Sequence, residues 1–101
     1  NLEEGVLWEG EKTINWDPGL NISYNALVDY RGKTILMDVE NSGKEWQIHV
    51  NGKKQIEYDQ NNPQPTEMTI ELPIPSDLNN DVKITGIDVT VKKLYISSTS
   101  E

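Results

Sequence analysis

Hydrophobic and polar residues alternate along most of this chain, which is the pattern of β-strands that bury one face. The alternation is clearest over residues 35–39, 46–50 and 68–72, and it returns over residues 82–84 and 89–96. Short strands at this spacing, about six to nine of them, are typical of β-sandwiches and jelly rolls. The pattern therefore predicts an all-β fold with antiparallel strands.

Turn signals separate the predicted strands. The sequence Asp17-Pro18-Gly19-Leu20 has the proline and glycine of a type II turn. Asn51-Gly52 is a strong hairpin signal, and it joins residues 45–50 to a strand expected at residues 53–58. The chain therefore reads as consecutive strands joined by tight connections.

Two segments depart from regular alternation. Between residues 91 and 94 the hydrophobic positions change parity, so we expect a β-bulge near residues 92–93. Residues 24–31 have a helical pattern one or two turns long, with Ser23 as N-cap and Gly32 as the C′ residue. We therefore expect an antiparallel β-sandwich of jelly-roll type with one short helical turn near residues 24–31.

The whole chain of 101 residues has the length of one domain. We expect a single β-sandwich over residues 1–101, with a core at about residues 5–96 and a polar linker at residues 97–101. The abrupt start at Asn1 and the polar end are typical of a module taken from a longer protein.

Composition narrows the function classes. The chain has 9 basic and 17 acidic residues, a formal net charge of -8, which argues against binding to nucleic acid or to an anionic membrane surface. No apolar run approaches ~18 residues, so we expect no membrane span. Cysteine is absent, which excludes disulfides and thiol chemistry. A neutral ligand or a cation fits this charge balance better, and we expect a monomer.

Three segments carry a resemblance to a known family, in their order and spacing: Val6-Leu7-Trp8-Glu9-Gly10 followed by Asn15-Trp16-Asp17; residues 32–39 followed by Trp46-Gln47-Ile48-His49-Val50; and the closing residues 84–96. Together they resemble jelly-roll carbohydrate-binding modules of the galactose-binding-like type. The similarity covers roughly residues 5–96.

The resemblance implies a function. Such modules are appended to secreted bacterial enzymes that degrade polysaccharides, and they bind plant cell-wall glycans without catalysis of their own. It implies a secreted domain, an appended glycoside hydrolase and a polysaccharide ligand. Some relatives carry a further aromatic residue just after the hairpin turn. Lys53-Lys54 stands at that place here, and Tyr58 is the candidate to replace the missing aromatic.

The aromatic residues are almost all of the kind with a polar handle, since phenylalanine is absent. Trp8, Trp16 and Trp46 are candidates for a platform on which a sugar ring stacks. Core packing is the alternative for Trp46, because it shares parity with Ile48 and Val50, and also for Trp8, whose strand has mixed faces. Trp16 lies beside a turn, and we favour it as the residue that faces the ligand.

Polar candidates accompany the tryptophans. Gln47 and His49 lie on the strand face opposite Ile48, and both side chains can donate and accept hydrogen bonds to sugar hydroxyls. The alternative is an ordinary polar outer face. Glu9 is a further acceptor. His49 is the single histidine, which is weak support for catalysis or for a transition-metal site.

Acidic residues raise two other possibilities. Asp38 and Glu40 are two positions apart on one strand and face the same way, so they cannot flank a scissile bond from opposite sides. We therefore expect no enzyme activity. Glu9, Glu11 and Asp88 are candidate ligands for a structural calcium ion if the first and last strands pair, although no cofactor is required.

These observations predict a non-catalytic domain that binds plant cell-wall polysaccharide, a β-glucan, xyloglucan or related β-1,4-linked glycan. A structural or protein-interaction β-sandwich of a secreted protein is the alternative. It differs in predicting that all three tryptophans are buried.

Overall fold

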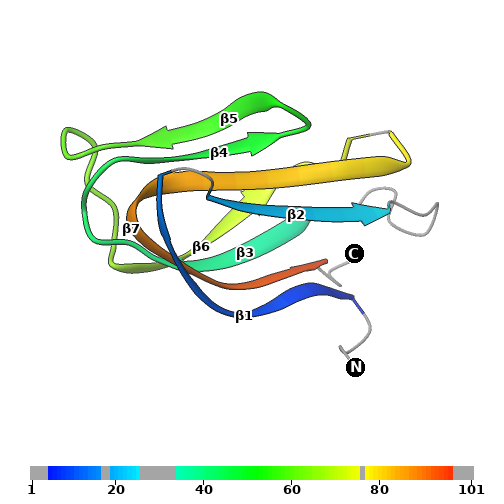
Figure 1. The fold of residues 1–101 in the computed structure, drawn as a ribbon, viewed down its shortest axis with the longest axis horizontal. Coiled ribbons are helices and arrows are strands. Elements are labelled where there is room, and N and C mark those ends of the chain that lie inside the picture. The colour runs from blue at the N-terminus through cyan, green and yellow to red at the C-terminus, as the bar shows by residue number, and fades with distance from the viewer. Residues whose placement is uncertain (1–4, 17–18, 26–33, 76, 97–101) are drawn as a thin grey trace.

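The computed structural model describes residues 5–16, 19–25, 34–75 and 77–96 (Figure 1). All strand pairs in this part of the chain are antiparallel, and no helix occurs among these residues. The strands are β1 (Val6–Asn15), β2 (Leu20–Asn25), β3 (Ile35–Glu40), β4 (Trp46–Val50), β5 (Lys53–Tyr58), β6 (Glu67–Leu72) and β7 (Asn79–Ile96). The predicted antiparallel β-sandwich is confirmed.

The long strand β7 belongs to both layers of the sandwich. Its second half pairs with β1 and β3, and β3 pairs with β6, which forms sheet A in the order β1-β7-β3-β6. Its first half pairs with β2 and β4, and β4 pairs with β5, which forms sheet B in the order β2-β7-β4-β5. In Figure 1, β7 runs along sheet B and then bends into sheet A beside β1 and β3.

The bend in β7 depends on close backbone contact. A Cβ atom on Gly86 would collide with the Cβ of Trp46, so only glycine allows this approach. Two residues later Asp88 has a φ of 54°, in the left-handed region. The Trp16 amide donates to the Gly86 carbonyl, and the Ile87 amide donates to the Glu45 carbonyl over 3.0 Å. The end of β1 and the start of β4 are therefore attached at the bend.

The core lies between the two sheets and follows the predicted alternation. Every second residue of β3, β4 and β6 faces inward, and the same holds for both halves of β7. The buried residues include Ile35, Met37, Val39, Trp46, Ile48, Val50, Ile70, Leu72, Val82, Ile84, Val89, Val91, Leu94 and Ile96. Opposite Asp38 lies Lys93 and opposite Val39 lies Val91, so Lys92 is the extra residue of a bulge. The predicted bulge near residues 92–93 is confirmed.

The local predictions had different outcomes. The hairpin at Asn51-Gly52 is confirmed, and both residues have positive φ, 52° and 84°, as a type I′ turn requires. The predicted helical turn is wrong at its start. Tyr24 and Asn25 end strand β2, where the Tyr24 side chain is buried in the core and pairing with β7 overrides the helical pattern. Residues 26–31 of that prediction, and Asp17-Pro18 of the predicted turn, lie outside the described residues.

Candidate functional site

The outward side chains of sheet B form the candidate site. Because Trp46, Ile48 and Val50 face the core, Gln47 and His49 on β4 point outward, as predicted. On the neighbouring β7, Thr85 lies opposite Gln47 and Lys83 lies opposite His49. On β2, Asn21 lies opposite Lys83. Pairing of three strands therefore gathers polar groups from distant parts of the sequence into adjacent rows.

A hollow of about 360 Å³ opens on this face. Its lining combines an amide, an imidazole, an ammonium, a carboxylate and a hydroxyl with a glycine at the rim: Asn21, His49, Lys83, Asp81, Thr85 and Gly52. Amide, imidazole and hydroxyl groups can both donate and accept hydrogen bonds. The hollow therefore suits a ligand that presents several hydroxyl groups close together.

One end of the hollow is held by a network around Asp81. The Ser23 hydroxyl donates to Asp81 Oδ1 over 2.6 Å, and the Asp81 amide donates to Asn51 Oδ1 over 2.8 Å. Asn51 Nδ2 in turn donates to Oδ1 of the buried Asn80 over 2.9 Å. These bonds tie the β4–β5 turn to β2 and β7, so this end of the hollow is fixed before any ligand arrives.

The histidine has unused hydrogen-bonding capacity. His49 is half-buried, and its Nδ1 atom is buried without a hydrogen-bond partner in the part of the chain that the structure describes. Buried polar atoms usually have partners. His49 Nδ1 is therefore an exception to this rule.

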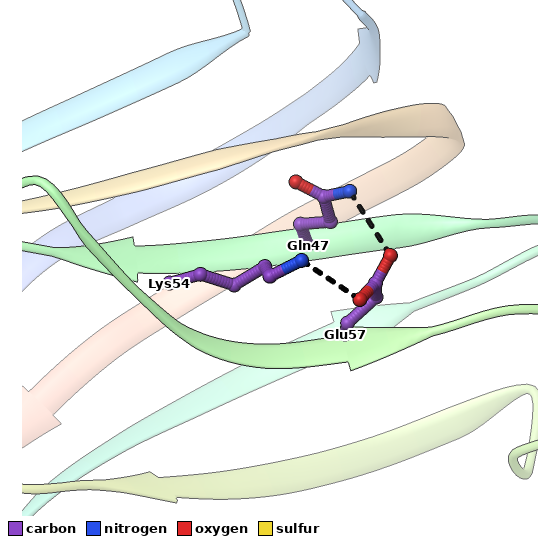
Figure 2. Close-up of polar contacts among 3 residues, drawn as sticks. All are labelled: Gln47, Lys54 and Glu57. Carbon is purple, nitrogen blue, oxygen red and sulfur yellow. Dashed lines mark hydrogen bonds and ion pairs between the residues drawn. The ribbon is translucent and has the colours of Figure 1, made fainter.

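A second network holds Gln47 on the side away from β7. Figure 2 shows Gln47 Nε2 donating to Glu57 Oε2 over 3.3 Å and Lys54 Nζ paired with Glu57 Oε1 over 2.9 Å. The hydrogen bond from the Lys54 ammonium, and then its charge, hold the pKa of the Glu57 carboxyl below its usual range. Glu57 is therefore an ionised acceptor beside Gln47.

Trp16 lies at the end of this face. It is 40% exposed, and its φ of 42° takes the chain out of the strand conformation. Its amide donates to the carbonyl of Gly86, which directly follows Thr85. A Cβ on Gly19 would lie 2.8 Å from Thr85 Cγ2. The backbones of Trp16 and Gly19 thus both lie near Thr85, which lines the hollow.

One of the predicted platform residues lies in the core, and another packs against it. Trp46 is 1% exposed, and its ring packs against Tyr58 with 4.7 Å between ring centroids. The prediction that Trp46 faces a ligand is wrong, because Trp46 shares the inward parity of Ile48 and Val50. Tyr58 is half-buried beside it, and burial raises the pKa of its hydroxyl. Neither ring is therefore available as a sugar platform on the outer face.

The residues predicted from β1 lie in the other sheet. Trp8 is half-buried against the core, and its ring lies over Gly10, where an added Cβ would be 3.3 Å from two ring atoms. Glu9 is exposed opposite Lys93 in sheet A. The structure therefore places Gln47 and His49 on one face of sheet B, with the Trp16 backbone bonded to Gly86 on the neighbouring strand, and it leaves Trp8 and Glu9 in sheet A.

A chain with a similar fold is known. A structure search finds similarity to a family 35 carbohydrate-binding module from an environmental isolate, with a TM-score of 0.56 and 13% sequence identity. The match covers 98% of this chain and 80% of that one. The domain has a fold like that of a carbohydrate-binding module. No protein-family model matches the sequence, and no curated protein matches it.

The predicted calcium ligands do not converge. The first and last strands do pair, but Glu9 lies opposite Lys93, whereas Asp88 is next to the residues opposite Ile14 and Asn15. The register therefore separates Glu9 from Asp88 by several residues along the strands. The described residues contain no group of three or more His, Asp or Glu side chains placed to hold a metal ion.

Asp38 and Glu40 lie on one face of β3, as predicted. Asp38 Oδ1 accepts hydrogen bonds from the Thr69 hydroxyl over 2.7 Å and from the Tyr95 hydroxyl over 3.4 Å. Glu40 Oε1 lies 3.3 Å from Lys92 Nζ. Both carboxylates thus have partners on the outer face of sheet A.

Within the described part of the chain, no helix is long and apolar enough to cross a membrane.

Sequence reasoning missed several residues of the hollow. Lys83 and Thr85 alternate with the buried Val82 and Ile84, so their outward direction was visible in the sequence. Their place beside His49 and Gln47 was not, because it depends on the pairing of β4 with a strand more than thirty residues away.

Proposed function

We propose that this domain binds plant cell-wall polysaccharide on the outer face of sheet B. The observation that carries the proposal is the hollow beside His49, lined by groups that complement hydroxyls. The exposed Trp16 is bonded through its backbone to Gly86, the residue after Thr85. The similarity in fold to a carbohydrate-binding module supports it. The glycan is a β-glucan, xyloglucan or related β-1,4-linked chain, as the sequence resemblance implies.

The arrangement suits a polymer rather than a single sugar. Asp81, Lys83 and Thr85 are alternate residues of β7, so the row that they form is roughly 13 Å long. This length exceeds one sugar ring. His49, Thr85 and Asn21 exchange hydrogen bonds with hydroxyls of successive rings, and the Trp16 indole stacks on the apolar face of a ring at the end of the row.

The role is binding without catalysis. Of the described residues that line the hollow, Asp81 is the one carboxylate, and its Oδ1 already accepts a bond from Ser23. Hydrolysis of a glycoside by the usual route needs two carboxyl groups on either side of the bond. In this proposal the domain is secreted and belongs to the same chain as a glycoside hydrolase, which it keeps at high local concentration on its substrate.

Affinity gel electrophoresis tests the proposal. The purified domain is run in gels containing hydroxyethylcellulose, barley β-glucan, xyloglucan, glucomannan, galactomannan or xylan. We expect retardation by the β-glucans or xyloglucan, and we expect Trp16→Ala to reduce the retardation about tenfold in apparent affinity, the loss of one stacking contact.

Tyr95→Ala is the matched control, because it removes a half-buried aromatic ring from the outer face of sheet A. It should leave retardation unchanged. Migration unaffected by every polysaccharide would overturn the proposal. It would favour a structural or protein-interaction domain, an alternative whose expected burial of the tryptophans holds for Trp46 but not for Trp16.

A further inference from the structure

The amide of Gln47 has a defined orientation. An ionised carboxylate only accepts hydrogen bonds, so the group that Gln47 turns toward Glu57 must be its nitrogen. Its carbonyl oxygen then points away from Glu57, as Figure 2 shows. Glu57 lies directly opposite Gln47 on β5, and Thr85 lies opposite it on β7. Gln47 does not itself line the hollow, but its neighbour on β7, Thr85, does.

A bulge in β5 makes this arrangement possible. Ile48 lies opposite Ile56, but the next residue, His49, lies opposite Lys54, so Gln55 is an extra residue. Residues three apart on a regular strand point to opposite faces. Because of the bulge, Lys54 and Glu57 point to the same face and form an ion pair of 2.9 Å. The chain thus departs from regular pairing at the place where Glu57 is held.

We propose that Glu57, held by Lys54, is a positioning residue that keeps the Gln47 carbonyl directed at the ligand as a hydrogen-bond acceptor. The inference rests on the proposed function and extends it to ligand chemistry. An acceptor at this point requires a donor from the ligand. The site therefore selects a neutral sugar with a free hydroxyl here, and it disfavours an ether oxygen or a carboxylate, which can only accept.

The test measures binding of barley β-glucan by wild type and variants in affinity gels. In Glu57→Gln the new side chain can donate as well as accept, so the Gln47 amide is free to turn. We expect affinity to fall about three- to tenfold, the effect of one hydrogen bond. Lys54→Met should weaken binding in the same direction, and Lys54→Arg, which keeps the ion pair, should restore it.

Glu71→Gln is the matched control. Glu71 is an exposed carboxylate on β6 of sheet A, so the substitution changes net charge by the same amount without touching Gln47. It should bind as wild type does. An equal loss in both variants would show that net charge causes the effect, and it would overturn the positioning role.

A double-mutant cycle separates positioning from general structure. Gln47→Ala should weaken binding, and adding Glu57→Gln to it should have no further effect, because the amide that Glu57 orients is gone. Equal effects of Glu57→Gln with and without Gln47 would overturn the inference. So would wild-type affinity in Glu57→Gln while Gln47→Ala binds weakly. That last result would leave the proposed function intact, whereas failure of wild type to bind would overturn the glucan assignment and the inference with it.

Discussion

The two outer faces of the sandwich use the same kinds of side chain differently. On sheet A, polar groups are paired with one another: Thr69 and Tyr95 donate to Asp38, Lys92 pairs with Glu40, and Lys93 Nζ lies 4.9 Å from the centre of the Tyr95 ring. On sheet B, the side chains of Asn21, Lys83 and Thr85 form no such pairs within the described residues, and they surround a hollow.

This difference distinguishes side chains that stabilise the fold from the side chains of Asn21, Lys83 and Thr85, which are free to bind. A polar group already paired with a neighbour must break that bond before it bonds to a ligand, so little free energy is gained. A group that is solvated in a hollow exchanges water for ligand instead. The sequence pattern predicts an ordinary polar surface for both outer faces. Only the side-chain hydrogen bonds and ion pairs of the folded structure distinguish the two.

Both sheets also contain a bulge, with different consequences. In sheet A the bulge residue Lys92 forms an ion pair with Glu40. In sheet B the bulge at Gln55 brings Lys54 to Glu57 and, through it, to Gln47. The first bulge residue takes part in a surface ion pair, and the second bulge places Lys54 and Glu57 beside Gln47.

The largest expected effect separates the buried tryptophan from the exposed one. Trp46→Ala leaves a cavity between the sheets and should lower the free energy of unfolding by about 3–5 kcal/mol. Trp16→Ala should change it by less than about 1 kcal/mol, because the indole is 40% exposed. Urea denaturation measures both. Similar losses in the two variants would contradict the division between core and ligand-facing tryptophans.

Much of this division could be predicted from the sequence. The parity of residues 46–50 predicts that Gln47 and His49 face outward, and the same rule favours Trp46 in the core over its candidacy as a ligand residue. The bulge of Lys92 was also visible, because alternation on both sides of it was unambiguous. Strand periodicity thus carries information about faces.

Other features depend on pairing that periodicity does not contain. Tyr24 begins a segment whose sequence pattern predicts a helical turn. Its pairing with β7 and its burial nevertheless make it a strand residue. The bulge at Gln55 leaves no parity signal, because residues 53–55 are all polar. Which strands join which sheet is decided where β7 bends at Gly86, and that contact with Trp46 joins residues forty positions apart.

An intermediate effect concerns the inner side of sheet B. Tyr24 is buried beneath this sheet, and burial raises its pKa from 10.0 to about 12. The unfolded chain loses this proton at lower pH than the folded chain does, so stability is complete below pH 10.0 and falls as pH rises toward about 12. Each pH unit in that window should cost about 1.4 kcal/mol.

Urea denaturation between pH 9 and 12 checks this dependence, which should be weaker in Tyr24→Phe by roughly the amount that one tyrosine contributes. The same variant should retain wild-type binding at neutral pH, since the hydroxyl is on the inner side of the sheet. A pH dependence that is identical in Tyr24→Phe and wild type would show that another group controls alkaline unfolding.

The smallest effects compare the two outer faces directly. Asp38→Ala removes the acceptor of two hydrogen bonds on sheet A, and it should lower stability by about 0.5–1.5 kcal/mol without changing affinity for glucan. Thr85→Val removes a hydroxyl of the hollow on sheet B while keeping the shape of the side chain. It should leave stability within about 0.5 kcal/mol and weaken binding about three- to tenfold. Thermal unfolding and affinity gels are measured on both variants. We expect Asp38→Ala to lose stability and keep binding, and Thr85→Val to keep stability and lose binding. Binding lost in Asp38→Ala and kept in Thr85→Val would move the ligand to sheet A, where the paired side chains would then have to open to receive it.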